Sequence, residues 1–174
     1  MKIDDNILRN QDLDIFFKSN FQGQILPIHC ATFGALLPEE LNDDKYIYDC
    51  ISYIRDIEMV LDVDDIEILT ENVIRILGQD NAENPILRDR LLSPQERIEE
   101  YVSTFRVMAR KGFYSFDKLH CPNELPDIDN SFDYLLIAKP KEENKILFHY
   151  HRDFIIHHDL EILKECNSLD LRYR

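Results

Sequence analysis

The chain is poor in glycine and contains no tryptophan. Only four glycines are spread over 174 residues, which argues against a loop-rich barrel or a glycine-rich phosphate-binding protein. The sequence also lacks Gly-x-x-x-x-Gly-Lys, Gly-x-Gly-x-x-Gly and Gly-x-Ser-x-Gly. Nucleotide binding and serine-hydrolase chemistry therefore have no support from a sequence motif.

Long apolar runs are missing as well. No stretch approaches the roughly 20 apolar residues that span a bilayer. The first residues are acidic where a signal peptide has a basic start and an apolar run, so we expect a cytoplasmic protein. No Cys-x-x-Cys pair occurs. Reduced and mostly buried thiols are therefore a better interpretation than disulfides for all of the cysteines, which are Cys30, Cys50, Cys121 and Cys166.

Acidic side chains are concentrated in one part of the chain. The formal net charge is −14, and residues 39–75, with twelve acidic and three basic side chains, account for −9 of it. Such a concentration produces a directional field that attracts partners of opposite charge. Nucleic acid and anionic membrane surfaces are disfavoured, because both are bound through Lys and Arg. A basic protein partner is favoured.

The apolar content predicts a folded domain, since 44% of residues are hydrophobic and there are ten Phe and eight Tyr. The best-marked element is a helix over residues 94–111. Ser93 is a suitable N-cap, Pro94 suits the first helical position, and Glu96 completes a capping box. Gly112 suits the position after the helix. The apolar stripe comprises Ile98, Tyr101, Val102, Phe105, Met108 and Ala109.

The acidic stretch predicts two further amphipathic helices. Apolar residues recur at helical spacing from Ile47 to Leu61, with Asp49, Ser52 and Asp56 on the opposite side. A second helix is expected to begin near Asp65 and to end at Gly78. It would bury Ile66, Leu69, Val73 and Ile76 and expose Glu67, Glu71 and Arg75.

The sequence predicts a hairpin and a short helix near the C-terminus, but near the N-terminus it leaves two interpretations open. Residues 132–138 and 146–150 predict a hairpin with a turn at 141–144, and residues 159–166 suggest a short helix capped by Asp159. Residues 12–18 suggest a helix, whereas 25–37 fit either a strand followed by a helix or one buried helix. We expect one domain over residues 1–174, of α+β class, with amphipathic helices packed with a small late antiparallel sheet.

Histidines cluster near the C-terminus, at positions 149, 151, 157 and 158. On a strand, His149, His151 and Asp153 would share one face, and such a set can hold zinc or iron. The run resembles the His-x-His-x-Asp-His motif of metallo-hydrolases, but Phe154 stands where the motif has its last histidine. The family is therefore not assigned, and no cofactor is expected.

Two other local patterns have ordinary interpretations. His29-Cys30 and His120-Cys121 have no orienting Asn or Asp nearby in sequence, so core or loop residues are expected rather than activated thiolates. Residues 62–65, Asp-Val-Asp-Asp, resemble the start of a calcium loop, but Glu67 stands where that loop needs glycine. A helix start with clustered acids is the better interpretation.

These patterns favour a protein-binding inhibitor of a basic partner. The closest functional type is an immunity protein, which neutralises a nuclease-type toxin by covering its active site. Tyr46, Tyr48 or Tyr53 would serve as aromatic anchors. The expected acidic contact set is Asp49, Asp56, Asp64, Glu67 and Glu71. The alternatives are a DNA-mimic regulator and a small metal-dependent enzyme that uses His149, His151 and Asp153, with His157 as a further ligand.

Overall fold

The computed structural model describes residues 1–4, 7, 13–21, 24–31, 41–83, 94–118, 133–142, 161–163 and 168–170. The helices of these ranges are α2 (Asp44–Arg55), α3 (Thr70–Glu83), α5 (Pro94–Arg110) and the short 3₁₀ turn η1 (Val63–Asp65). The strands are β1 (Asp14–Phe21), β2 (Gln24–Ala31), β3 (Ile66–Ile68), β4 (Tyr114–Lys118), β5 (Asp133–Pro140), β6 (Glu161–Leu163) and β7 (Ser168–Asp170). Strands occur both before and after the helices, and the α+β class is confirmed.

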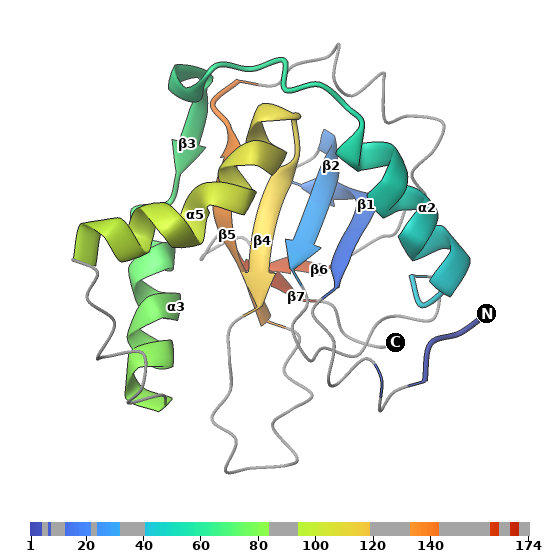
Figure 1. Cartoon of the computed structure of the whole chain (residues 1–174), viewed down its shortest axis with the longest axis horizontal. Helices are drawn as coiled ribbons and strands as arrows, with labels where there is room; N and C mark the ends of the chain where they lie inside the picture. The colour runs from blue at the N-terminus through green and yellow to red at the C-terminus, as the bar shows by residue number, and fades with distance from the viewer. Residues whose placement is uncertain are drawn as a thin grey trace.

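The strands form one mixed sheet in the order β1-β2-β4-β5-β7-β6 (Figure 1). β2 and β4 run parallel, whereas the other described pairs are antiparallel. β4 lies along one edge of β5, while β7 and β3 share the other edge. The expectation of a small late antiparallel sheet was therefore correct only in part, because the sheet begins with β1 and β2 and contains a parallel pair.

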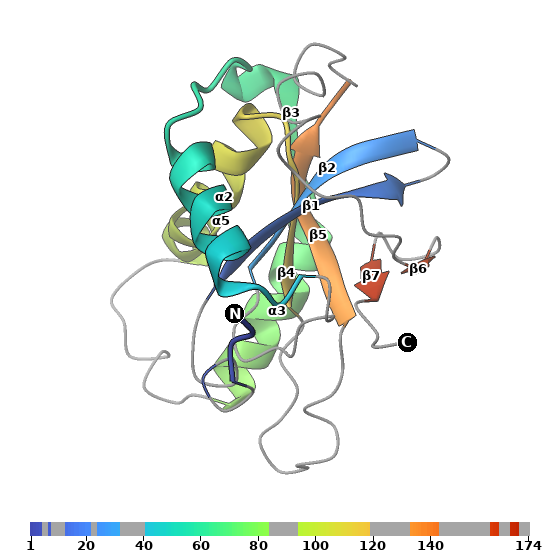
Figure 2. The same ribbon diagram turned by 90° about the vertical axis from the view of Figure 1, so that its right-hand side faces the viewer.

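Helices α2 and α5 lie on the same side of the sheet (Figure 2). α5 packs across β4 and β5, and α2 packs against β1. α3 contacts β5 and α5. None of the helices in the described part of the chain is long and apolar enough to cross a membrane.

The predicted helix α5 is confirmed. The helix expected from Ile47 to Leu61 is confirmed only in part, because α2 ends at Arg55. The sequences explain the ends of both helices. The Asp43 side chain caps α2 by accepting from the Tyr46 backbone N–H at 2.9 Å. Gly112 follows α5 with φ of 100°, a conformation that glycine adopts without a Cβ clash. The stripes are buried as expected, through Ile47, Cys50 and Ile54 of α2 and through Val102, Phe105 and Ala109 of α5.

The N-terminal expectations are partly corrected. The helix expected at residues 12–18 is wrong, because β1 occupies this segment and pairs along its length with β2. Residues 25–37 begin with a strand, as one of the two interpretations proposed. Ile15 and Phe17 are buried, but so is Phe16 between them. Because the strand is buried on both faces, it shows no period-two alternation that would have identified it.

The second acidic helix and the C-terminal helix are also corrected. Ile66 belongs to β3, the helix begins at Thr70, and it continues through Gly78 to Glu83. Val73 and Ile76 are nevertheless buried as predicted. Residues 161–163 form β6 and not a helix. The predicted strand near 132–138 is confirmed as β5, whereas its expected hairpin partner at 146–150 lies outside the described residues.

The edge of β5 between β7 and β3 is completed by the start of α3. The Leu69 backbone N–H donates to the Ile137 carbonyl oxygen at 2.8 Å. The Asn72 side-chain amide donates to the Leu136 carbonyl oxygen at 2.9 Å. A helix side chain thus supplies a hydrogen bond that a strand would otherwise provide, and this protects the edge of a central strand.

Replacing Asn72 with alanine is expected to lower the free energy of unfolding by about 1 kcal/mol, because the Leu136 carbonyl loses its donor. Urea unfolding followed by circular dichroism measures the change. Thr70→Ala, at an exposed position on the same helix, is the control. Equal stability of the wild type and Asn72→Ala would show that water replaces the amide at no cost.

Candidate functional site

The five acidic residues of the expected contact set are all exposed, but they fall into two groups. Asp49 lies on α2, and Asp56 follows the last residue of that helix. Asp64, Glu67 and Glu71 lie on η1, β3 and the first turn of α3. Figure 1 shows α2 and β3 on opposite sides of the C-terminal end of α5, with residues 56–62 running between them. The set is therefore extended across one end of the molecule.

Basic side chains pair with some of these acids. Lys45 pairs with Asp49 one turn away on α2. Arg55 lies 3.5 Å from Asp56, and Lys139 lies 3.4 Å from Glu67. Exposed pairs of this kind contribute little to stability and are screened by salt. A cation from a partner can therefore replace them at small cost.

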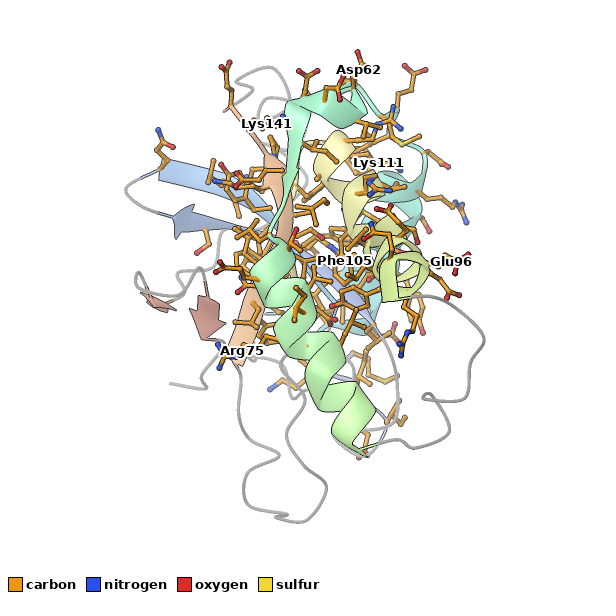
Figure 3. All side chains as sticks on the ribbon, turned by 90° about the vertical axis from the view of Figure 1, so that its left-hand side faces the viewer. Asp62, Arg75, Glu96, Phe105, Lys111 and Lys141 are labelled. Atoms are coloured by element: carbon orange, nitrogen blue, oxygen red, sulfur yellow. The ribbon has the colours of Figure 1, made fainter. Side chains whose placement is uncertain are left out.

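Residues 56–65, here called the acidic arc, connect α2 to β3 and contain no Lys or Arg. The backbone N–H groups of Val60 and Leu61 both donate to the Arg110 carbonyl oxygen at 3.1 Å, and Arg110 Nε donates to the Leu61 carbonyl oxygen at 2.8 Å. Lys141 Nζ donates to the Asp64 carbonyl oxygen at 2.6 Å. Figure 3 shows Lys141 and Asp62 at the same end of the molecule. The acidic arc is thus held by α5 and by the end of β5, with its acids at Asp56, Glu58, Asp62, Asp64 and Asp65.

The three candidate tyrosines differ in exposure. Tyr46 is partly buried, and its hydroxyl donates to the Phe16 carbonyl oxygen of β1 at 2.8 Å. Tyr53 is partly buried and packs against the core. Tyr48 is exposed. Of the three, Tyr48 presents the largest free surface, while Tyr46 fastens α2 to the sheet edge.

A surface hollow of about 310 Å³ lies beside the arc, lined by residues 67–72. Glu67 and Glu71 stand in its lining with Ile68 and Leu69. The hollow therefore combines two carboxylates with an apolar wall. Glu67 also pairs with Lys139. This arrangement suits the stem and charge of a basic side chain.

A chain of polar side chains crosses three adjacent strands and is buried except at Asp14, which is partly exposed. His29 of β2 lies between Asp14 of β1 and Ser115 of β4, with Nε2 2.9 Å from Asp14 Oδ1 and Nδ1 2.5 Å from Ser115 Oγ. The carboxylate only accepts, so Nε2–H donates to it, while Nδ1 forms a hydrogen bond with the Ser115 hydroxyl. His29 and Ser115 are fully buried, so substrate has no access to the hydroxyl. The chain therefore stabilises the sheet.

His29 was predicted to be a core residue, and its burial confirms this. Asp14 and Ser115 were not predicted as its partners, since no orienting Asn or Asp lies near His29 in the sequence. Ser115 is 86 residues away from His29 in the chain. Only the pairing of β2 with β4, which sets His29 opposite Ser115, brings them together. No local sequence pattern carries that information.

Other buried polar groups lie on the same strands. The Tyr101 hydroxyl of α5 donates to Asp117 of β4. Burial raises the pKa of the Cys30 thiol, and the Asp117 and Asp14 carboxylates raise it further. Cys30 and Cys50 are free and buried, as predicted, and such thiols are unreactive. Cys121 and Cys166 lie outside the described residues.

Acid pH is expected to weaken the Asp14–His29 interaction. Burial raises the pKa of the Asp14 carboxyl, but the hydrogen bond and the charge of His29 lower it more, so the net pKa lies below the ordinary 3.8. A carboxyl with a lowered folded pKa contributes stability above its unfolded pKa and loses it as the pH falls through the folded value. The unfolded pKa of an aspartate is about 4, so pH 5 and pH 3 lie about one unit above and below it. When the pH falls over this range, the free energy of unfolding of Asp14→Asn should therefore decrease less than that of the wild type. Urea unfolding at both pH values tests this, with Asp64→Asn as a surface control. Parallel losses in the wild type and Asp14→Asn would contradict the assignment.

His149, His151, Asp153 and His157 lie outside the described residues. Within the described ranges, no group of three His, Cys, Asp or Glu side chains is arranged to hold a metal ion. Asp62 and Asp65 instead form a reciprocal capping arrangement at the short 3₁₀ turn η1. Because β3 follows this turn directly, the expectation that a long helix begins here is wrong.

Comparisons with protein-family models, curated proteins and solved structures find no match to this chain.

Proposed function

We propose that this protein is an inhibitor that binds a basic protein partner. Its closest type is an immunity protein, which neutralises a nuclease-type toxin by covering its active site. The charge distribution supports this, since −9 of the net −14 lies in residues 39–75 and all five acids of the proposed contact set are exposed. A toxin that acts on a polyanion has a basic active site, and an acidic surface speeds encounter with it.

The observation that carries the proposal is the fixed backbone of the acidic arc. A segment with five carboxylates in ten residues repels itself, yet this one is held by hydrogen bonds from Arg110 and Lys141. Its carboxylates are thereby presented before a partner arrives. Pre-organisation reduces the entropy lost on binding. A DNA-mimic regulator would use the same charges against a different basic partner.

Co-purification from the native source at low and high salt identifies the partner. The expected result is one basic protein at near one-to-one ratio, weakened by salt. Recovery of no basic protein at low salt would contradict the inhibitor proposal.

Reversing the charges of Asp56, Asp64 and Glu67 to lysine is expected to slow association with that partner by roughly tenfold or more at low salt. The difference should shrink at high salt, because the field is screened. Stopped-flow or surface-based kinetics give the association rate constant at each salt concentration.

The matched control reverses Glu96, Glu99 and Glu100 on α5, which changes the net charge by the same amount. Figure 3 shows Glu96 well away from Asp62. If both triple variants slow association equally, net charge and not the proposed surface is responsible. If neither slows it, electrostatic attraction plays no part.

A further inference from the structure

Three apolar side chains of the acidic arc face solvent. Met59 is 46% exposed, and Val60 and Val63 are each 53% exposed. Single exposed apolar residues are common, but here three occur within five positions of the most acidic part of the chain. Their neighbours Ile57 and Leu61 pack against the core instead.

The tethering of the arc explains why these side chains stay outside. The Val60 and Leu61 N–H groups are held by the Arg110 carbonyl oxygen, and Leu61 packs inward. Turning Val60 inward would strain its hydrogen bond to Arg110. The backbone path of the acidic arc therefore keeps these three apolar side chains exposed in the folded protein.

An apolar centre with a charged rim is the composition of a protein-binding surface. Resting on the proposed function, we infer that Met59, Val60 and Val63 form the apolar centre of the partner interface. The partner segment that fits them carries apolar side chains flanked by Lys or Arg. The rim consists of Asp56, Glu58, Asp62 and Asp64.

Two other faces are weaker candidates. α2 exposes Tyr48 (54%) beside Asp49, with Lys45 one turn away. α3 exposes Ile74 (57%), next to the cationic Arg75. Each face offers a single large apolar side chain, whereas the arc offers three with five carboxylates and no cation of its own.

A pair of synthetic peptides tests the inference without knowledge of the partner. One is a 12-residue peptide of lysine and leucine, about three turns long when helical, and the other replaces each leucine with serine at the same charge. The leucine peptide is expected to bind about tenfold tighter, a difference that modest apolar burial supplies. In methyl NMR spectra, the signals of Met59, Val60 and Val63 should shift on its addition, and that of Ile74 should not.

The double variant Met59→Ser/Val63→Ser should bind the leucine peptide only as tightly as the wild type binds the serine peptide. Ile74→Ser should bind as the wild type does. Equal, salt-sensitive binding of both peptides would overturn the apolar centre while leaving the electrostatic proposal intact. Binding of neither peptide at low salt would count against the proposed function itself. Shifts confined to α2 would move the interface there and overturn the inference.

Discussion

Replacing His29 with alanine is expected to lower the free energy of unfolding by roughly 3–5 kcal/mol, the range for removing a large buried ring. His29 is fully buried and stacks on Phe16, with ring centroids 5.1 Å apart. Its loss opens a cavity and also strips two polar groups of their partner. Ser115 is fully buried, so water does not readily compensate its hydroxyl.

Urea unfolding at pH 7 measures this loss, and Ser115→Ala is the matched control. That variant removes one hydrogen bond and almost no volume, so a loss of about 1 kcal/mol is expected. If the two variants lose equal stability, the imidazole ring contributes no more than its bond to Ser115. A His29→Ala protein as stable as the wild type would contradict the polar chain as a structural element.

Replacing Lys111 with methionine is expected to destabilise the protein by about 2–3 kcal/mol, because the ammonium makes charge-assisted hydrogen bonds. Lys111 is buried although it is charged. Its Nζ donates to the carbonyl oxygens of Ile54 at 2.8 Å and Arg55 at 3.1 Å, at the end of α2. Methionine preserves the length of the stem but removes the Nζ donor from both carbonyls, so that the Ile54 oxygen keeps only backbone donors such as the Ile57 N–H at 3.2 Å.

Lys139→Met is the control for this experiment. Lys139 pairs with exposed Glu67, and such pairs contribute about 1 kcal/mol or less. Thermal melting compares the two variants, and fraying of α2 in Lys111→Met should appear as faster amide exchange in its last turn. Identical melting temperatures would indicate that the α2 carbonyls are hydrated in the folded protein.

The elements that the sequence predicted correctly are those defined by local chemistry. α5 has its proline at the start and glycine after its end, and α2 has an aspartate cap and a stripe of apolar residues. β1 was missed because apolar residues on both faces remove the alternation that identifies a strand. β3 was absorbed into the predicted helix because Ile66 fits a helical stripe as well as a buried strand. Only its pairing with Pro140 and Ala138 of β5 distinguishes the two.

The candidate surface was predictable in composition but not in geometry. Exposure of Asp56, Asp64 and Glu67 follows from their charge. The separation of Asp64 and Glu67 from Asp49 depends on how the chain crosses the end of α5, which is a tertiary property. The exposure of Met59 and Val63 was not predicted, because neither residue belongs to an expected apolar stripe and its environment depends on how residues 56–65 lie against α5.

The parallel pairing of β2 with β4 also sets the order in which the chain can fold. β1 and β2 pair locally, but the His29–Ser115 contact closes a loop of 86 residues, and contacts between residues so distant in sequence slow folding. At about 5–20 residues per second, synthesis of that loop takes several seconds. During this interval the nascent β1–β2 pair exposes a strand edge and the apolar side chains that β4 later covers. Chaperone binding or a slow folding phase is expected at this stage, before β4 emerges and docks.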